Sequence, residues 1–421
     1  MSVAEGLRGI RLDAKRRYPN DAKRRLAHTC KLTARAIQEV LRITTSIPYG
    51  IRAARLHRAA TESGRCIADQ RYGTHERQTA DVWLPPRDKQ AEEREKVGKP
   101  PPIVLFVHGG VWSSGDSWHY APMANALAQR GAVCVVMKYR LYPEVRAEEQ
   151  VADVCAAVSW VSSSVAPKHC ADAANLSLVG HSAGAHLASL ALVAKAATMS
   201  DDAPKAARRV VEAIGRSALD DMDVVPARFV ALNGVFDIPT HYQYEAWRGV
   251  EALSTMARAM GGDSHEAMAA LSPSRLLRES NDAEPPPGGR NLPHRLGLCA
   301  KARNAEHASL AKHLPRTHVF AALGDTTVPW EEQSAAFHHE LSRGGAASEL
   351  LLYPAPLGHG DLALCWPDDA GAPKPWHAAG TMSQAAVRAG LRAEAAHGGE
   401  ARCDSLPPWA HDLVGVVHGS G

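Results

Sequence analysis

Short apolar runs alternate with segments of helical periodicity through most of the chain. The run at 103–107 is continuously apolar, as in a strand buried on both faces of a sheet. Further strands are predicted at 133–138, from 176 to the glycine at 180, and at 229–232, 317–323 and 349–353. Helices are predicted between them at 120–130, 147–161, from 183 onward and at 331–343. The alternation predicts an α/β fold, with a mainly parallel central sheet and helices on both faces.

Several segments flank or interrupt this alternation. A β-hairpin is predicted from strands at 66–72 and 79–84, followed by a charged, proline-bounded surface loop at 87–102. The segment 200–225 is charged, and we predict a loop there. The segment 237–277 is rich in Met and Ala with a helical pattern. Its position suits a cap over a site, and ordinary helix packing would give the same periodicity.

Two insertions have a low-complexity composition, at about 279–303 and 366–406, and the second holds one helical piece at 383–395. A closing helix is predicted at 409–417, with Leu413, Val416 and Val417 packed inward. We therefore predict a basic N-terminal arm over residues 1–63 and one domain over residues 64–421 that carries both insertions.

Charge is distributed unevenly along a chain of otherwise ordinary composition. Of 421 residues, 45% are hydrophobic and 22% charged, which is typical of a soluble globular protein with a sizeable core. The net charge is +3, but residues 1–60 hold fourteen Lys and Arg against four Asp and Glu. The basic character therefore belongs to the arm.

The arm has four open interpretations. A helical stretch is predicted at 31–43 with one apolar face, and a basic amphipathic helix suits peripheral contact with an anionic membrane surface. A solvated arm, a helix packed on the main domain and a transit peptide are the alternatives. No nucleic-acid partner is expected, because the arm lacks interleaved aromatics and a binding module.

The cysteine pattern indicates the redox environment of the protein. The eight cysteines form no C-x-x-C pair, and several lie in apolar runs, so we expect free buried thiols in a reducing compartment and no metal site. There is no apolar signal segment at the start and no run of eighteen apolar residues. We expect an intracellular protein, either at the endoplasmic reticulum or Golgi surface or in the cytoplasm.

The candidate chemistry centres on the string Gly180-His181-Ser182-Ala183-Gly184. An apolar run leads into it and a helical pattern follows it, which indicates a nucleophile elbow between a strand and a helix. The two glycines let the strand and helix approach closely while the serine oxygen points outward. Ser182 is therefore the candidate nucleophile.

A second motif follows the strand at 103–107, in His108-Gly109-Gly110-Val111-Trp112. Consecutive glycines after a central strand let backbone N–H groups face one point, which suits an oxyanion hole. We predict Gly109, Gly110 and Ala183 as its donors. His108 precedes the serine, so we expect it to orient the loop, since the triad order places the base late.

An acid and a histidine complete the set in the expected order. Asp325 follows the strand at 317–323 in Gly324-Asp325-Thr326, and His359 lies on a glycine-flanked loop after the last strand. The order of oxyanion loop, serine, acid and histidine predicts acyl transfer through a serine ester. In this scheme His359 is the base and Asp325 orients it. This chemistry needs no metal and no organic cofactor.

The strings HGGVW, YRLYP, GHSAGAHL, LSPSRLL, GDTTVP and GHGDL resemble the isoprenylcysteine methylesterase branch of the α/β-hydrolases. The resemblance covers about residues 66–365, apart from 279–303. It implies the α/β-hydrolase fold and hydrolysis of the methyl ester on a prenylated cysteine. Ser182, Asp325 and His359 match the triad of that family, and Gly109 and Gly110 match its HGG loop.

Substrate choice stays open between a small-molecule ester and a prenylated peptide ester. The same motifs suit a general short-chain carboxylesterase or an arylformamidase, and a catalytically silent binding protein is the alternative from another class. The elbow reads His181, where the methylesterase branch often has Gln, and His is common there among esterases and formamidases. Composition does not set the oligomeric state.

Overall fold

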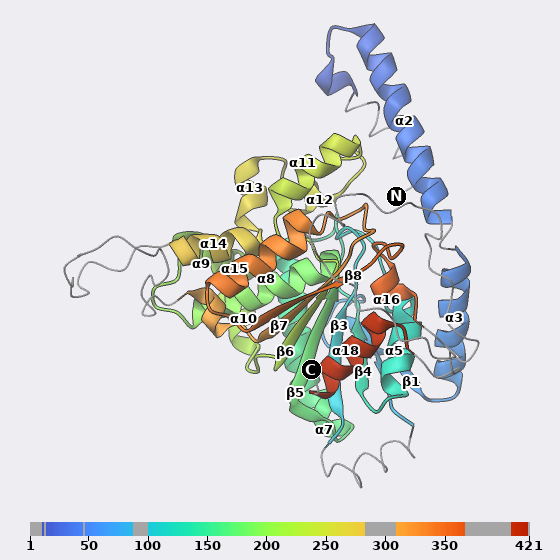
Figure 1. Ribbon diagram of the computed structural model, residues 1–421, viewed down its shortest axis with the longest axis vertical. Helices are drawn as coiled ribbons and strands as arrows, with labels where there is room; N and C mark the ends of the chain where they lie inside the picture. Colours follow the sequence, from blue (N-terminus) through green and yellow to red (C-terminus); the bar gives the residue numbers. More distant parts are fainter. Residues whose placement is uncertain are drawn as a thin grey trace, which may run out of the picture.

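A computed structural model describes residues 11, 14–44, 47–86, 100–282, 309–366 and 406–419. Its centre is an eight-stranded sheet in the order β1-β2-β4-β3-β5-β6-β7-β8 (Figure 1). Strand β2 runs antiparallel to both of its neighbours, and the other neighbouring pairs are parallel. The strands are β1 (Cys66–Arg71), β2 (Thr79–Trp83), β3 (Pro102–Val107), β4 (Val133–Met137), β5 (Asp172–His181), β6 (Arg228–Leu232), β7 (Arg316–Ala322) and β8 (Ser348–Tyr353).

Helices cover both faces of the sheet, and strands and helices alternate along the chain. The longer ones in the main domain are α5 (Ala121–Ala128), α6 (Ala147–Trp160), α8 (Ala183–Thr198), α9 (Lys205–Ile214), α11 (Ile238–Arg248), α14 (Pro273–Asp282), α15 (Ala336–Arg343) and α18 (Pro408–His418). Shorter pieces are η1 (Ser117–Tyr120), η2 (Val161–Val165), α7 (Ala166–Lys168), α10 (Arg216–Asp221), α12 (Met256–Ala259), α13 (His265–Ala270), η3 (Leu310–His313), η4 (Glu331–Ala335) and α16 (Asp361–Leu364). The predicted α/β-hydrolase fold is confirmed.

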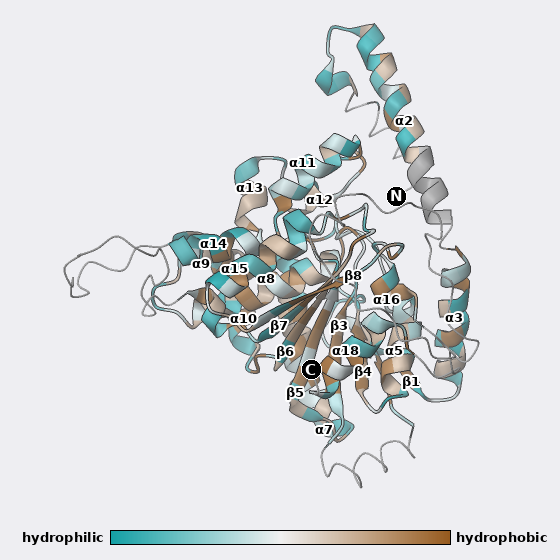
Figure 2. Ribbon diagram, in the orientation of Figure 1, coloured by the Kyte–Doolittle hydropathy of each residue, from teal (hydrophilic) through white to brown (hydrophobic). Residues whose placement is uncertain are grey.

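Alternating side chains of the central strands build a core on each face of the sheet. In β3, Ile103, Leu105 and Val107 pack with α6, α8 and α9, whereas Val104 and Phe106 pack with α5 and α18. Figure 2 shows these strands as the most hydrophobic part of the ribbon. The predicted strand at 103–107 is thus buried on both faces, because a parallel sheet covered by helices leaves neither face to water.

Most predicted elements agree with the structure to within a few residues. The hairpin forms from β1 and β2. The closing helix is α18, and Leu413, Val416 and Val417 are buried as expected. Six cysteines in the described residues are free, of which Cys30 and Cys170 are exposed and the other four buried.

The loop predicted at 200–225 is wrong, because this segment contains α9 and α10. Charged residues dominate its composition, and they conceal an apolar stripe at helical spacing. The stripe consists of Ala207, Val210, Val211 and Ile214, all buried against the core. Burial of this stripe outweighs the polar composition, as expected for an amphipathic surface helix.

The two predicted insertions are only partly described. Residues 279–282, assigned to the first, form the last turn of α14, so the helix extends further than predicted. Trp366, at the start of the second, is fully buried in the core. The remainder of both insertions, the helical piece predicted at 383–395 and most of the loop predicted at 87–102 lie outside the described residues.

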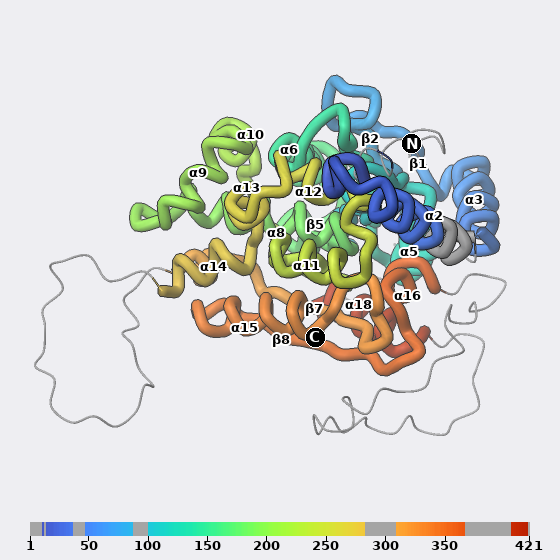
Figure 3. Tube along the Cα trace, turned by 90° about the horizontal axis from the view of Figure 1, so that it is seen from above, coloured from blue at the N-terminus to red at the C-terminus, as the bar shows by residue number. Residues whose placement is uncertain are grey.

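Two helices precede the sheet. Helix α2 (Ala22–Thr44) begins nine residues before the predicted helix, and α3 (Ile47–Glu62) follows it. Helix α3 packs beside α5, η1 and β1. Helix α2 projects away from the sheet in Figure 1 and overlies the cap helices when the molecule is seen from above in Figure 3. Among the described helices, none is both long and apolar enough to cross a membrane. The domain boundary at residue 63 stays a prediction.

Candidate active site

Ser182 lies at the turn between β5 and α8. Its backbone has φ of 53° and ψ of −120°, a conformation that a residue with a side chain adopts only under strain. A Cβ on Gly180 would collide with the backbone of Ala185, and one on Gly184 would collide with the carbonyl oxygen of Val107. Both glycines are therefore required by packing, and the turn has the geometry of a nucleophile elbow.

Side chains from three loops form one hydrogen-bonded chain at this turn. Nε2 of His359 lies 2.9 Å from Oγ of Ser182, and Nδ1 of His359 lies 2.7 Å from Oδ2 of Asp325. A carboxylate only accepts hydrogen bonds, so the proton of the neutral imidazole is on Nδ1. Nε2 then accepts from the serine hydroxyl. The structure thus brings together the serine, acid and histidine that the sequence predicted.

Asp325 is held by the loop that follows β7. Its Oδ1 accepts the backbone N–H groups of Thr327 and Val328 at 2.8 and 2.9 Å, which leaves Oδ2 for His359. The preceding Gly324 packs directly on the histidine loop, because a Cβ there would collide with the carbonyl oxygen of Leu357. The loops of the acid and the histidine are therefore fixed against each other.

The oxyanion loop after β3 differs from the prediction at Gly109. The N–H of Gly109 donates to the hydroxyl of Tyr120 at 3.0 Å, so it already has a partner. Within the described residues, the N–H groups of Gly110 and Ala183 have no hydrogen-bond acceptor. Ala183 is the first residue of α8, whose leading N–H groups lack partners within the helix. Gly110 and Ala183 are thus the available donors for an oxyanion.

Gly109 has a packing role instead. A Cβ at this position would crowd the Cβ of Ser182 and Nδ1 of His181. We expected His108 to orient the loop. Its Nδ1 donates to the carbonyl oxygen of the next residue, Gly109, at 2.8 Å. Its ring stacks on Tyr139, with 4.2 Å between centroids. Burial lowers the pKa of His108 to about 3, so the ring is neutral.

Trp112 ties the far end of the oxyanion loop to the rest of the protein. Its indole N–H donates to Nδ1 of His186 at 3.1 Å, and Nε2 of His186 donates to the carbonyl of Leu271 at 2.7 Å. The carbonyl of Trp112 accepts from Gln150 at 2.8 Å. Sequence reasoning missed His186, although it lies one helical turn after Ser182 on the same helix.

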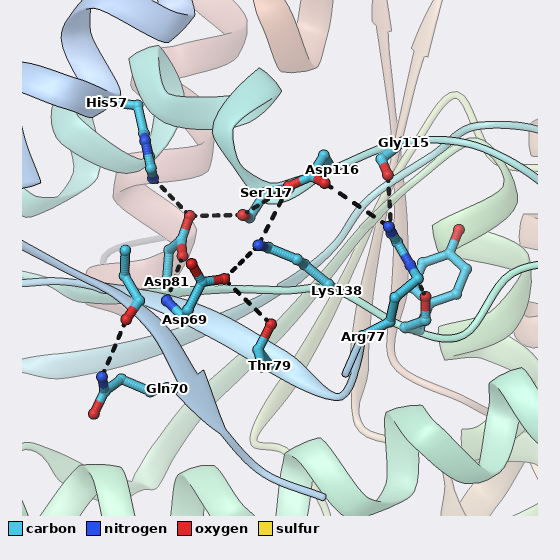
Figure 4. A network of polar contacts seen from close by, with 12 residues as sticks. His57, Asp69, Gln70, Arg77, Thr79, Asp81, Gly115, Asp116, Ser117 and Lys138 are labelled. Carbon is cyan, nitrogen blue, oxygen red and sulfur yellow. Dashed lines mark hydrogen bonds and ion pairs between the residues drawn. The ribbon is translucent and has the colours of Figure 1, made fainter. Parts of the chain in front are cut away.

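A polar network beneath the sheet edge fixes the chain that follows the oxyanion loop (Figure 4). Arg77 donates to the carbonyl oxygens of Gly115 and Tyr139 at 3.0 and 2.9 Å. Ser117 donates to Asp81 at 2.6 Å, and Asp81 also pairs with His57 of α3 at 2.8 Å. The network therefore joins helix α3, the hairpin and the oxyanion loop.

His57, Cys66 and Asp81 could in principle hold a metal ion, since their donor atoms all lie within 4.8 Å of one another. However, Oδ2 of Asp81 contacts His57 directly and accepts from Ser117, while Oδ1 accepts the N–H of Asp69 at 3.0 Å. Hydrogen bonds thus already engage both carboxylate oxygens of Asp81.

The predicted cap contacts both active-site loops. Thr255 donates to the carbonyl of Val111 in the oxyanion loop at 2.6 Å, and Tyr244 donates to the carbonyl of Thr326 in the acid loop at 2.9 Å. His241, also on α11, is buried, and its pKa is lowered to about 3 by burial and then by the nearby charge of His359. The segment 237–277 is therefore hydrogen-bonded to both of the loops that flank the triad.

Acid is expected to destabilise the fold. Burial lowers the pKa of His108, His181 and His241 to about 3 and that of His186 to about 4. In the unfolded chain a histidine titrates near 6.5, so below that pH the unfolded state binds more protons. The contribution of these neutral imidazoles to the free energy of unfolding is therefore fully present above about pH 6.5. Below that pH it falls by about 1.4 kcal/mol per pH unit for each such histidine, until the pH reaches the pKa of the folded state.

Glu245 acts in the opposite direction, because burial raises its pKa to about 7, and burial raises the pKa of Glu148 as well. The four buried histidines outnumber these two carboxyl groups. Thermal unfolding followed by circular dichroism from about pH 7.5 to about pH 4.5 measures the net effect. We expect the melting temperature to fall steeply below about pH 6.5. A melting temperature independent of pH over this range would contradict neutral burial of these imidazoles.

The fold defines an α/β-hydrolase in which the serine at the elbow is hydrogen-bonded to a histidine and, through it, to an aspartate. The comparisons agree. Residues 91–267 match the family described as BD-FAE. A probable isoprenylcysteine alpha-carbonyl methylesterase of Oryza sativa is 34% identical over 129 residues, covering 31% of this chain and 29% of the relative. The chain is thus similar to carboxylesterases of the α/β-hydrolase fold.

Other relatives widen the range of activities. Kynurenine formamidase of Drosophila melanogaster is 30% identical over 143 residues, covering 34% of this chain and 43% of the relative. Among solved structures, esterase B of Lactobacillus rhamnosis is 18% identical, with a TM-score of 0.49 and coverage of 79% of this chain and 91% of that one. The chain spans less than two thirds of the length of the methylesterase relatives from Oryza sativa and Arabidopsis thaliana.

Proposed function

We propose that this chain is a serine carboxylesterase that hydrolyses the methyl ester of a prenylated cysteine. The reaction class rests on the hydrogen bonds that link Ser182 to His359 and His359 to Asp325. The substrate rests on similarity to the isoprenylcysteine methylesterases.

The acylation step follows from the hydrogen-bond directions. Nε2 of His359 takes the proton of Ser182 as Oγ attacks the ester carbonyl, and Asp325 stabilises the imidazolium through Nδ1. Negative charge then develops on the carbonyl oxygen. The N–H groups of Gly110 and Ala183, which have no acceptor among the described residues, are its proposed donors, and one such donor is typically worth about 10²- to 10³-fold in rate.

The tetrahedral intermediate collapses when the imidazolium returns its proton to the leaving alkoxide. Methanol departs, and the acyl group stays on Ser182 as an ester. Water then attacks this ester while His359 again accepts a proton. The imidazolium returns that proton to Oγ of Ser182 as the acyl–oxygen bond breaks, and the carboxylic acid leaves. The same groups serve both halves of the reaction, so no external oxidant, reductant or metal enters the balance.

A substrate comparison tests the assignment. We would measure kcat/KM on farnesylcysteine methyl ester, a short p-nitrophenyl ester and N-formylkynurenine, with Ser182→Ala as the blank. The proposal expects the prenylated ester to give the highest value, because a matched prenyl group contributes transition-state binding. Preference for the short ester or the formamide would keep the mechanism and replace the substrate.

The formamide is the second candidate, because the formamidase relative matches this chain at similar identity. A binding protein without activity would be indicated if folded protein failed to react with a fluorophosphonate at Ser182.

The basic arm bears on the same question. Arg17 pairs with Glu251 at 2.7 Å and Arg16 with Asp263 at 3.6 Å, so these two arm residues lie beside the cap segment. Trp247 of α11 is 81% exposed on that cap. These features support the predicted peripheral contact with an anionic membrane, where a lipid-modified ester would be presented. That contact and the cellular location stay predictions.

A further inference from the structure

His181 precedes the nucleophile and links three parts of the site. It is the last residue of β5, and its side chain is buried, with 5% of the residue exposed. Nε2 lies 2.9 Å from the carbonyl oxygen of His359, and Nδ1 lies 3.2 Å from the hydroxyl of Tyr120. The Tyr120 oxygen in turn accepts the N–H of Gly109. The imidazole therefore bridges the histidine loop and the oxyanion loop.

The partners fix the direction of every hydrogen bond in this bridge. A carbonyl oxygen only accepts, so the proton of His181 is on Nε2. Nδ1 of the neutral ring then accepts from the Tyr120 hydroxyl, whose oxygen is free to accept from Gly109. One continuous relay runs from Gly109 N–H through Tyr120 and His181 to the backbone of His359, with each donor matched to one acceptor.

We propose that His181 is a positioning residue, which holds the backbone of His359 and the oxyanion loop in register with Ser182. This inference rests on the proposed function and identifies a residue that acts through others, without touching the substrate. Its ring centroid lies 5.0 Å from that of His359, and burial keeps it neutral, so no second positive charge opposes the imidazolium formed at His359.

A second donor shows how tightly this backbone is held. Nδ2 of Asn233 also lies 2.9 Å from the carbonyl oxygen of His359, while Oδ1 of Asn233 accepts the N–H of Ala322 at 2.8 Å. Losing His181 therefore leaves the carbonyl oxygen of His359 with Asn233 as its remaining donor among the described residues, so the loop shifts without detaching. The expected defect is a misplaced imidazole in a folded protein.

The test compares substitutions that remove or keep the relay. His181→Phe fills the space and removes both hydrogen bonds. His181→Gln keeps one donor for His359 and one acceptor for Tyr120. Tyr120→Phe removes the central hydroxyl alone. His318→Gln is the matched control, because His318 is another buried histidine, on β7, paired with Glu349 away from the triad.

Steady-state kinetics on a short p-nitrophenyl ester are the main measurement. We expect kcat to fall by about 10- to 100-fold for His181→Phe and for Tyr120→Phe with KM little changed, because displacement of a reacting group by about 1 Å can cost about 10²-fold. His181→Gln should recover most of kcat. The double variant should lose far less than the product of the single losses, since both remove one relay.

The outcomes separate the two claims. Absence of turnover by the wild type would overturn the proposed function. Turnover by the wild type with normal kcat in folded His181→Phe, or with no recovery in His181→Gln, would overturn the positioning role. As a readout independent of turnover, ¹⁵N NMR should find His181 protonated on Nε2 alone at about pH 7, and protonation on Nδ1 would also overturn it.

Discussion

Replacing Ser182 with alanine is expected to lower kcat by about 10⁵- to 10⁶-fold without loosening the fold. The substitution removes the hydroxyl oxygen that His359 activates. Alanine adopts the φ of 53° with the same backbone strain as serine, so the turn is kept. Donors at Gly110 and Ala183 stay in place, and such groups alone preserve about 10³- to 10⁴-fold catalysis over water. A small residual rate is therefore expected above the spontaneous rate.

The measurement is turnover of a p-nitrophenyl ester together with fluorophosphonate labelling and thermal unfolding. Ser189→Ala is the matched control, since Ser189 is buried in the same helix and donates only to the carbonyl of His186. It should keep wild-type activity. Substantial turnover by Ser182→Ala, or labelling at another residue, would show that the nucleophile lies elsewhere.

Ser182 and its two triad partners were predictable because each sits where local sequence fixes the backbone. The elbow needs Gly180 and Gly184 for close approach, and the acid follows a strand in a short glycine-led loop. Apolar runs such as that of β3 identify strands without knowledge of their neighbours. The order of the eight strands, by contrast, depends on pairing between distant segments, which no local pattern encodes.

The hydrogen bonds around His181 could not be predicted from the sequence. Gly109 looked like an oxyanion donor because it precedes Gly110 in the glycine pair, yet its N–H is taken by Tyr120 from the following helical segment. Asn233, which holds the carbonyl of His359, belongs to a strand end more than a hundred residues earlier. These contacts arise from folding of the whole sheet and have no signature in either segment.

Replacing Asp325 with asparagine is expected to lower kcat by about 10⁴-fold while KM changes little. The side-chain oxygen of asparagine can still accept from Thr327 and Val328, as Oδ1 of Asp325 does. Its amide nitrogen then faces Nδ1 of His359, where Oδ2 was. Because that nitrogen donates, His359 must move its proton to Nε2, so the atom facing Ser182 can no longer accept the serine proton.

The same change removes the negative charge that stabilises the imidazolium, so both effects act on the chemical step and neither acts on substrate binding. Steady-state kinetics separate kcat from KM, and Asp412→Asn is the matched control, because Asp412 accepts from Tyr353 on the edge strand β8. That control should behave as wild type. If Asp325→Asn lost only a few-fold in kcat, another carboxylate would have to orient His359. The close packing of Gly324 on the histidine loop would then be a structural contact alone.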